Sequence, residues 1–276
     1  MQTIWPDQKK CSVALCFDFD AETLWFNGGK EATPTPTSRG EYAAFLAVPR
    51  ILDLLDQHEM LSTFFVPGYT VEKYPEIVRE IKQRGHEIGH HGFYHETPVT
   101  MDYEEEKEIL EKGIRAIEEA TGSRPLGYRS PAWDLSHNSL SLLSEFGFLY
   151  DSSMMADEKP YVVNPGIGQP PLVEIPVEWL LDDAPHFLFN FSPKYRIGMA
   201  DPDKVYRIWK EEFDGYYQNE GCFNLTMHPQ VIGRYHRINL LDDLITYMKS
   251  HSRVWFARCI DIAKYWHEKN NTGQGG

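Results

Sequence analysis

Segments with strand character alternate with segments of helix character along the chain, and this alternation constrains the fold more than any other feature. Short runs rich in apolar residues are each followed by a longer stretch whose apolar residues recur at helical spacing. Seven or eight such units favour a parallel sheet closed into a barrel over an open sheet. The expected strands are 12–20, 60–66, 86–91, 126–129, 148–150, 171–176, 222–228 and 253–257, and the expected helices are 49–57, 71–84, 103–120, 136–146, 201–219, 240–250 and a final one that ends near 269.

Two of the expected strands carry small and polar residues on one face and bulky apolar residues on the other. The polar faces comprise Ser12, Ala14, Cys16, Asp18 and Asp20 in the first strand and Cys222, Asn224, Thr226 and His228 in the other. A barrel explains this pattern, because its bulky residues point outward to the helices. We therefore expect an α/β fold, a single distorted (β/α) barrel of the TIM-like type, in which the C-terminal strand ends bring Asp18, Asp20 and His228 together.

Composition narrows the partners and the number of domains. The 276 residues include 27 lysines and arginines against 41 aspartates and glutamates, a net charge of −14, so nucleic acid and anionic membranes are not expected partners. No apolar run approaches the length of a membrane span, and no apolar segment follows the first charges, so we expect a cytoplasmic protein.

The composition does not change abruptly at any point along the chain, so we expect one catalytic domain over 1–270 and a disordered tail over 271–276. The sequence leaves open whether the protein forms a homo-oligomer. Residues 22–48 and 151–169 are expected to be loops that wall a pocket.

Residues 85–95 contain four of the eleven histidines of the chain, which suggests a metal site. Strand alternation turns His91 toward the barrel mouth and His90 away from it, and His95 follows His91 by four residues. Two imidazoles and a carboxylate such as that of Asp20 would hold one divalent metal, for which zinc is the expected ion, and would leave a position open to water. The alternative is a polar barrel mouth without a metal.

Four motifs within residues 11–260 resemble those of the polysaccharide deacetylase (NodB-homology) family of metal-dependent amide hydrolases. In chain order they are Phe17-Asp-Phe-Asp-Ala-Glu22, His91-Gly-Phe-Tyr-His95, Tyr128-Arg-Ser-Pro-Ala-Trp133 and Leu225-Thr-Met-His228. The resemblance implies that Asp18 is the catalytic base, that Asp20, His91 and His95 are the metal ligands, and that His228 is the catalytic acid. Arg129 belongs to the third motif and is expected to keep Asp18 ionised.

The first motif departs from the usual Thr-Phe-Asp-Asp-Gly of the family, because a phenylalanine separates the two aspartates. This variant is similar to a cytoplasmic branch with peptidoglycan-deacetylase-like proteins, cyclic-imide hydrolases and allantoinase relatives. The first expectation is hydrolysis of an amide carbon–nitrogen bond by N-deacetylation of an amino sugar of the peptidoglycan or oligosaccharide type. The alternatives are opening of a small cyclic amide or imide, and a metal-binding sugar binder without turnover.

Substrate contacts and the partner of the acid are less constrained by the sequence. Glu22, Trp25, Tyr94 and Trp133 lie beside the motifs and are expected to bind the amide-containing small molecule or sugar, although aromatic residues of this frequency also serve packing. The aspartate that orients His228 stays open between Asp151 in one segment and the pair Asp182 and Asp183 in another.

Overall fold

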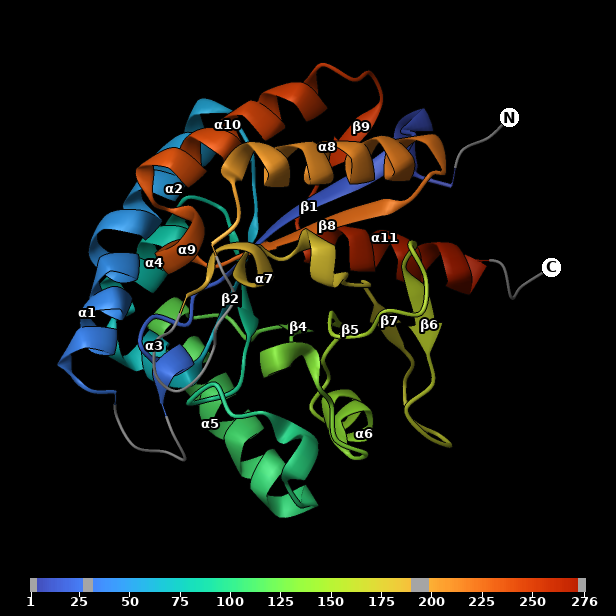
Figure 1. The fold of residues 1–276 in the computed structure, drawn as a ribbon. Coiled ribbons are helices and arrows are strands. Elements are labelled where there is room, and N and C mark those ends of the chain that lie inside the picture. Colours follow the sequence, from blue (N-terminus) through green and yellow to red (C-terminus); the bar gives the residue numbers. More distant parts are fainter. Residues whose placement is uncertain (1–3, 27–31, 190–198, 273–276) are drawn as a thin grey trace.

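A single curled sheet lies at the centre of the molecule and helices cover its outer face (Figure 1). The computed structural model describes residues 4–26, 32–189 and 199–272. The strands of these residues are β1 (Cys11–Asp18), β2 (Thr63–Val66), β3 (Glu87–His90), β4 (Gly127–Tyr128), β5 (Tyr150–Asp151), β6 (Tyr161–Val163), β7 (Leu172–Glu174), β8 (Cys222–Met227) and β9 (Val254–Phe256). Except for β6, which is antiparallel to β7, every paired strand runs parallel to its neighbour, as the alternation of strands and helices predicts.

Helices form at every position where the sequence predicts one, and three further helices, at 34–42, 183–187 and 229–232, form in addition. The helices are α1 (Pro34–Tyr42), α2 (Val48–Gln57), α3 (Gly68–Lys73), α4 (Pro75–Gln83), α5 (Tyr103–Thr121), α6 (Ser139–Glu145), α7 (Asp183–Phe187), α8 (Pro202–Gln218), α9 (Pro229–Ile232), α10 (Tyr235–Lys249) and α11 (Cys259–Thr272). Short turns of helix also occur at η2 (Thr23–Trp25), η5 (Pro131–Trp133) and η6 (Trp179–Leu181), and a π-helical turn, η3 (Ala43–Ala47), joins α1 to α2. Among the described helices none is both long and apolar enough to cross a bilayer.

The strand order makes the barrel a distorted one. The sheet runs β6-β7-β5-β4-β3-β2-β1-β8, and β9 pairs with residues 11–13 of β1, while β2 pairs with residues 16–18. A single parallel bridge between Asp182 and Thr226 connects the segment after β7 to β8. The sheet therefore curls back on itself, and among the described residues a single bridge, instead of a continuous pair of strands, joins this segment to β8. This arrangement confirms the predicted distorted (β/α) barrel.

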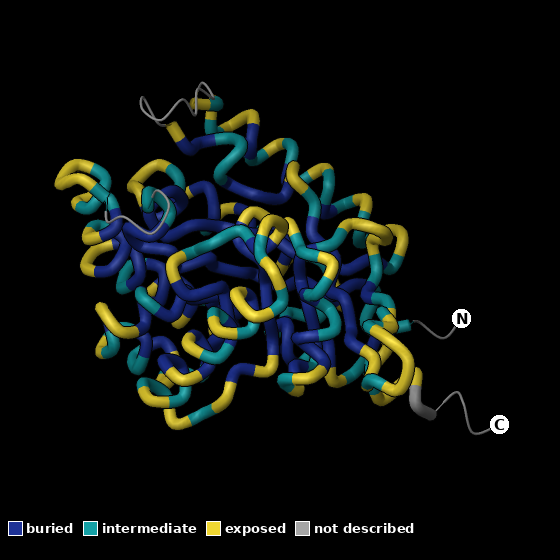
Figure 2. The backbone as a smooth tube through the Cα atoms, turned by 90° about the horizontal axis from the view of Figure 1, so that it is seen from below, coloured by how far each residue is buried: buried dark blue, intermediate teal, exposed yellow. Residues whose placement is uncertain are grey.

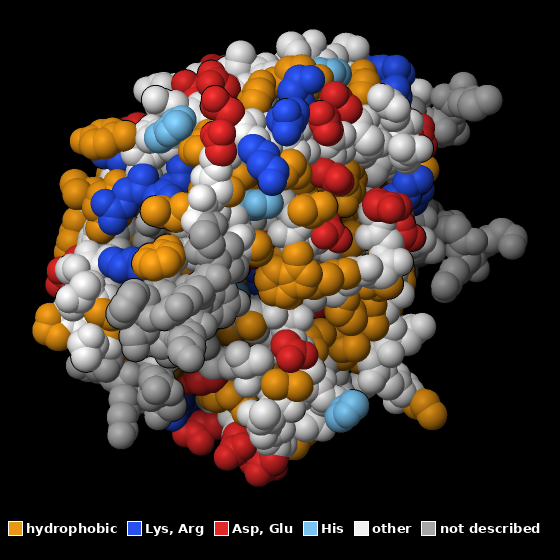
Figure 3. Space-filling view, in the orientation of Figure 1, with side chains coloured by type: hydrophobic (Ala, Val, Ile, Leu, Met, Phe, Trp, Pro, Cys, Tyr) orange, Lys and Arg blue, Asp and Glu red, His pale blue; other side chains and the backbone are white. Residues whose placement is uncertain are grey.

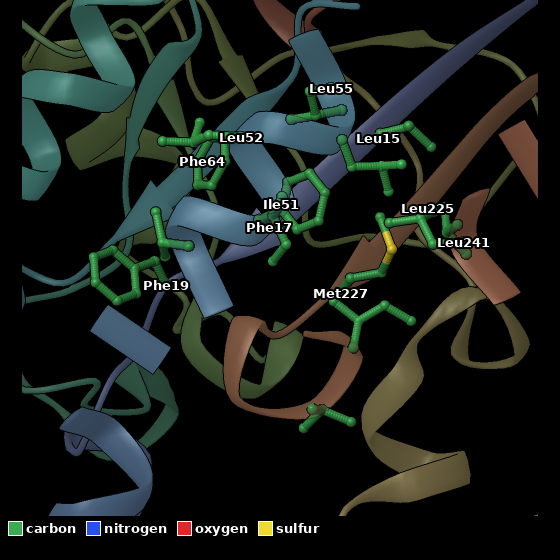
Figure 4. Close-up of a cluster of buried hydrophobic side chains, with 14 of the residues drawn as sticks. Leu15, Phe17, Phe19, Ile51, Leu52, Leu55, Phe64, Leu225, Met227 and Leu241 are labelled. Atoms are coloured by element: carbon green, nitrogen blue, oxygen red, sulfur yellow. The ribbon is translucent and has the colours of Figure 1, made fainter. Parts of the chain in front are cut away.

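The core confirms the predicted alternation along β1. Val13, Leu15 and Phe17 point outward into a cluster with residues of α2, α8 and α10, and Phe17 stacks on Phe64 with ring centroids 4.9 Å apart. Figure 4 shows Leu15 and Phe17 in this cluster, with Ile51 of α2 and Leu241 of α10. Ala14 and Cys16 belong to a separate cluster inside the sheet. Figure 2 shows buried backbone through the centre and exposed backbone at the periphery. Each fully buried side chain of this size contributes roughly 1.5–3 kcal/mol to folding, so the outward cluster holds the helices on the sheet.

The expected loop over 22–48 was wrong in its second half, where α1 and η3 form. Pro34 and Pro36 lie in the first turn of α1, where no backbone N–H is needed for the helix. Gly40 lets this helix approach the first motif, because a Cβ there would lie 2.3 Å from the backbone nitrogen of Glu22. The helix therefore packs directly against the segment that follows β1.

Other boundaries differ for local reasons. The expected helix 71–84 is divided into α3 and α4 at Tyr74, whose φ of −124° and ψ of 50° leave the helical region before Pro75. The expected loop 151–169 contains β6, and α10 begins at Tyr235 rather than at residue 240. Residues 271 and 272 of the expected tail are the last of α11, and 273–276 lie outside the described residues.

Candidate active site

The motif residues meet where parallel strands end. Asp18 is the last residue of β1, His91 follows β3, Arg129 follows β4 and His228 follows β8. Because the carboxyl ends of parallel strands lie on one side of the barrel, side chains more than 200 positions apart come within contact distance. Thus His228 Nε2 lies 3.7 Å from Asp20 Oδ2.

Asp20, His91 and His95 form a compact group, which we call the metal group. Asp20 Oδ1 lies 3.5 Å from His91 Nε2 and 3.8 Å from His95 Nε2, and one donor atom of each residue lies within 4.8 Å of the others. Asp20 is fully buried, yet neither of its carboxylate oxygens has a hydrogen-bond partner among the described residues. A buried carboxylate without a partner is costly, so the donor set fits a divalent cation.

Burial keeps both imidazoles of the metal group neutral. Desolvation lowers the pKa of His91 to about 4 and that of His95 to about 3. His91 Nδ1 lies 2.7 Å from the carbonyl oxygen of Arg129, which orients the ring with Nε2 toward Asp20. His95 has a φ of 63°, and Gly92 has a φ of 72°, so two left-handed residues turn the chain back toward the barrel axis.

His90, the neighbour of His91, points the other way as strand alternation predicts. Its Nε2 lies 3.2 Å from the carbonyl oxygen of Leu110 in α5. A Cβ on Gly113 of the same helix would lie 2.1 Å from that nitrogen, so a glycine is required for α5 to approach β3. His90 therefore joins the helix to the sheet and does not face the site.

Asp18 is paired with a buried arginine. Arg129 Nη1 donates to Asp18 Oδ1 at 2.9 Å and to Thr226 Oγ1 at 3.0 Å, and Arg129 Nη2 donates to Ser152 Oγ at 2.9 Å. Although burial raises the pKa of Asp18, the charge and hydrogen bond of Arg129 together with the charges of His91 and His228 outweigh it and lower that pKa below its usual value. The second oxygen, Asp18 Oδ2, lies 3.9 Å from His91 Nε2, beside the metal group.

His228 belongs to a second group, with Asp182 and Asp183, which we call the acid group. His228 Nδ1 lies 2.7 Å from Asp183 Oδ1, and the His228 backbone N–H donates to Asp183 Oδ2 at 3.0 Å. Burial alone would lower the pKa of His228, but the charges of Asp182 and Asp183 raise it well above its usual value. The imidazole is therefore positively charged at neutral pH, and Nδ1 donates to Asp183.

The structure distinguishes the three aspartates that the sequence left open. Asp183 contacts the backbone nitrogen and Nδ1 of His228. In contrast, Asp182 Oδ1 accepts a hydrogen bond from the backbone N–H of Ala184 and lies 3.6 Å from His228 Nδ1. Asp151 accepts a hydrogen bond from Ser153 at 2.8 Å, in a different part of the barrel. Only Asp183 of these three is hydrogen-bonded to the histidine among the described residues.

A cavity of about 450 Å³ opens onto both groups. Trp133 is 8% exposed and packs against Trp179, with ring centroids 4.3 Å apart, while Trp179 is 46% exposed. Together they give one wall an aromatic surface. The cavity is lined by Asp18, Leu24, His91, His95, Ala132, Trp133, Trp179, Asp182, Ala184, Pro185, Leu188 and His228.

Three of the four expected substrate contacts do not line this cavity. Glu22 is buried, accepts a hydrogen bond from Tyr74 at 3.1 Å and pairs with Lys73. Trp25 packs against the core, and the guanidinium carbon of Arg39 lies 4.4 Å from the centroid of its ring. Tyr94 lies over a separate hollow beside α5 and packs near Tyr69.

The sequence reasoning missed two features of the site. Trp179 comes from a short helical turn more than 40 residues from Trp133, and no spacing signal relates the two. Ser152 after β5, and Thr226 and Asn224 of β8, accept hydrogen bonds from the guanidinium of Arg129. The alternation along β8 predicted that Asn224 and Thr226 face the barrel interior, but it did not indicate that Arg129 is their partner.

Comparisons with known proteins agree with this arrangement. The sequence model of the polysaccharide deacetylase family matches residues 42–150. A peptidoglycan deacetylase of Helicobacter pylori is 31% identical over 95% of this chain and 98% of its own. A solved structure from Mycobacterium smegmatis that carries the family name is 37% identical over 98% and 94% of the two chains, with a TM-score of 0.91, and the structure of an allantoinase is 26% identical over 96% and 92%, with a TM-score of 0.83. The motifs, the barrel and these relatives agree that the chain belongs to the polysaccharide deacetylase family of amide hydrolases.

Proposed function

We propose that this protein is a metal-dependent hydrolase that removes the N-acetyl group from an amino sugar of the peptidoglycan or oligosaccharide type. The observation that carries the proposal is the metal group: a fully buried carboxylate with no hydrogen-bond partner among the described residues faces two neutral imidazoles. Such a donor set suits zinc, which we propose as the resident ion.

Asp20, His91 and His95 would hold the metal. When bound, a divalent metal supplies Lewis-acid activation of the amide carbonyl and of a water molecule. His91 Nδ1 is hydrogen-bonded to the backbone carbonyl oxygen of Arg129, which orients the imidazole ring. Nε2 of His91 is therefore the nitrogen that would face the ion.

Asp18 is proposed as the base. Its Oδ1 is engaged by Arg129, which leaves Oδ2 to take the proton of the attacking water. Because the pKa of Asp18 is lowered, the carboxylate is ionised and ready to accept a proton at neutral pH. Arg129 thus acts through Asp18 as a positioning residue.

His228 is proposed as the acid. Its raised pKa keeps a proton on both ring nitrogens, and Asp183 accepts the one on Nδ1. His228 lines the cavity, and because Nδ1 is bonded to Asp183, Nε2 is the nitrogen that can give its proton to the departing nitrogen, which would otherwise leave as a strongly basic anion.

The aromatic wall and the relatives favour a ring-shaped substrate. A sugar ring or a flat cyclic amide could pack against Trp133 and Trp179. The Helicobacter pylori relative is named a peptidoglycan deacetylase, which favours the sugar, while the allantoinase similarity supports cyclic-amide opening as the second candidate.

Product analysis by mass tests the proposal. The zinc-loaded protein is incubated separately with acetylated chito-oligosaccharides, with peptidoglycan disaccharides and with succinimide or hydantoin, and Asp18→Asn is the control. Loss of one acetyl group per sugar is expected for the sugars and not for the control. Ring opening alone would replace the first candidate by the second, and no product from any substrate would leave only the binding role.

A further inference from the structure

The guanidinium of Arg129 is a buried cation whose hydrogen-bond donors are all engaged. Lysines and arginines on the face shown in Figure 3 lie at the surface, several of them beside aspartates and glutamates, whereas the Arg129 side chain is fully buried. A guanidinium has five N–H donors. In Arg129 the acceptors are Asp18 Oδ1 and Thr226 Oγ1 for Nη1, Ser152 Oγ and Asn224 Oδ1 for Nη2, and the Ser152 carbonyl oxygen for Nε. Asp18 is the one charged acceptor of this set, so the neutral contacts decide which way the guanidinium faces.

Ser152 supplies two of these neutral contacts. Its carbonyl oxygen accepts from Arg129 Nε at 3.1 Å and its hydroxyl oxygen accepts from Nη2 at 2.9 Å, whereas Asn224 Oδ1 lies 3.4 Å from Nη2. The Ser152 hydroxyl donates its own proton to the carbonyl oxygen of Ile175 at 2.9 Å and accepts from Asn224 Nδ2 at 3.1 Å. Because a hydroxyl has one donor and two acceptor positions, its hydrogen bonds are complete, and its oxygen can only accept from the guanidinium.

The next residue, Ser153, fixes the backbone of Ser152 from the other side of the segment. Ser153 Oγ accepts from the backbone N–H of Ser130, which follows Arg129 in the third motif, at 2.9 Å. The backbone N–H groups of Ser153 and Met154 both donate to Glu174 Oε1 at 2.9 Å. The segment after β5 is therefore bonded both to the third motif and to β7.

A buried carboxyl pair completes this support. Asp151 and Glu174 are fully buried, and Asp151 Oδ2 and Glu174 Oε2 have no other partner among the described residues. Burial and the charge of Asp151 raise the pKa of Glu174 well above its usual value, so Glu174 is protonated and donates to Asp151. Asp151 also accepts from Ser153 Oγ at 2.8 Å. Asp151, which the sequence left open as a partner of His228, thus supports the backbone that carries Ser152.

We propose that Ser152 is a positioning residue for the base: it holds the guanidinium of Arg129 in the orientation that engages Asp18 Oδ1. The inference rests on the proposed function, because it assigns Ser152 a role in that reaction. Without the Ser152 hydroxyl, Nη2 keeps only the 3.4 Å contact with Asn224, so the guanidinium is free to turn. Asp18 then loses its fixed orientation beside the metal group, while the lining of the cavity, to which Ser152 does not belong, stays the same.

Nitrogen-15 NMR of the zinc-loaded protein with labelled arginine measures the restraint on the guanidinium without any substrate. In the wild type we expect separate, slowly exchanging signals for the Nη protons of Arg129, because each nitrogen has acceptors. In Ser152→Ala these signals should broaden and merge as the guanidinium turns. Ser144→Ala removes another buried hydroxyl, one that donates to the carbonyl oxygen of Pro170 in α6's surroundings, and should keep the signals of the wild type.

Steady-state kinetics of the same variants test the consequence for turnover. Ser152→Ala is expected to lower kcat about tenfold or more, as for the loss of one hydrogen bond to a charged group. KM should change less than about twofold, because the cavity lining is unchanged. Ser152→Cys, whose sulfur is a weaker acceptor than a hydroxyl oxygen, provides the same test if Ser152→Ala fails to fold.

The outcomes separate the role of Ser152 from the proposed function. Restrained Arg129 signals in the Ser152 variants, a kcat equal to that of the wild type, or an equal fall of kcat in Ser144→Ala would overturn the positioning role. Signals that are restrained in the wild type and released in Ser152→Ala, without turnover of any substrate by the wild type, would support the hold of Ser152 on Arg129 and contradict the proposed function alone.

Discussion

The metal group and the acid group use the same kinds of side chain and lie on the same cavity, yet their electrostatics are opposite. In the metal group, the carboxylate of Asp20 has no hydrogen-bond partner in the described structure and both imidazoles have lowered pKa values. In the acid group, Asp183 accepts two hydrogen bonds from His228, whose pKa is raised.

The difference teaches that hydrogen-bond satisfaction, and not residue type, separates a cation site from a charged acid. In the acid group, the protonated imidazole of His228 is itself the cation that balances the charge of the Asp183 carboxylate. Two neutral imidazoles beside an unsaturated carboxylate instead require a cation from outside. Four predictions test this comparison, in order of decreasing effect.

Removing an imidazole from the metal group should have the largest effect. His91→Ala and His95→Ala are expected to lower zinc affinity by at least about 100-fold. Loss of a residue that only hydrogen-bonds to a metal ligand already lowers metal affinity by about 10- to 100-fold, and loss of a ligand itself should lower it further. Metal content after dialysis, measured by mass spectrometry, checks this. His228→Ala should keep the metal, and His137→Ala is an exposed control; a metal lost from His228→Ala but kept in His91→Ala would reverse the two groups.

Neutralising the base should abolish turnover without removing the metal. Asp18→Asn retains a side-chain oxygen toward Arg129 but cannot take a proton, so kcat is expected to fall by about 10²- to 10⁴-fold. Metal content and kcat are measured on the same sample. Full activity would show that Asp18 only supports its neighbours.

Neutralising the partner of the acid should move the pH profile. Activity requires protonated His228, so it falls as the pH rises through the pKa of this residue. Asp183→Asn removes a negative charge that raises that pKa, and the alkaline limb of kcat is therefore expected to shift to lower pH, by about one unit or more. Kinetics across pH 6–10 check this, and an unchanged limb would contradict the assignment of His228 as the acid.

Asp182→Asn should have the smallest effect below pH 7, where protonation removes the Asp182 charge that otherwise raises the pKa of His228. Asp182 makes no hydrogen bond to His228 among the described contacts, and burial raises its pKa to about 7, so it is partly protonated at neutral pH. An asparagine can keep the bond to the Ala184 N–H. We expect less than about threefold loss of kcat at pH 6 and a greater loss above pH 7, where the wild-type carboxylate ionises. A loss as large as that of Asp183→Asn would make the two aspartates equivalent.

Much of the site could be predicted because it depends on strand periodicity. Alternation along β1 and after β3 separated Asp18 and Asp20 from Phe17 and Phe19, and His91 from His90, and the structure has all of them on the predicted sides. The parallel order of β1, β3 and β8 then brings their carboxyl ends to one side of the barrel.

The choice of aspartate and the cavity wall could not be predicted in this way. Asp183 and His228 are 45 positions apart, and Trp179 reaches Trp133 from an irregular segment. Contacts of this kind depend on the paths of loops, for which the sequence carries no periodic signal. Likewise, α1 forms in a segment for which the sequence predicted a loop.

The sequence by itself therefore determined the barrel, the inward faces of its strands and the residues of the motifs, because side chains alternate with a period of two and strand ends gather on one side. Only the tertiary structure decided that Asp183 partners His228 and that Trp179 completes the wall. These features arise from segments that pack against one another in space, and their hydrogen bonds and charges take effect only once that packing exists.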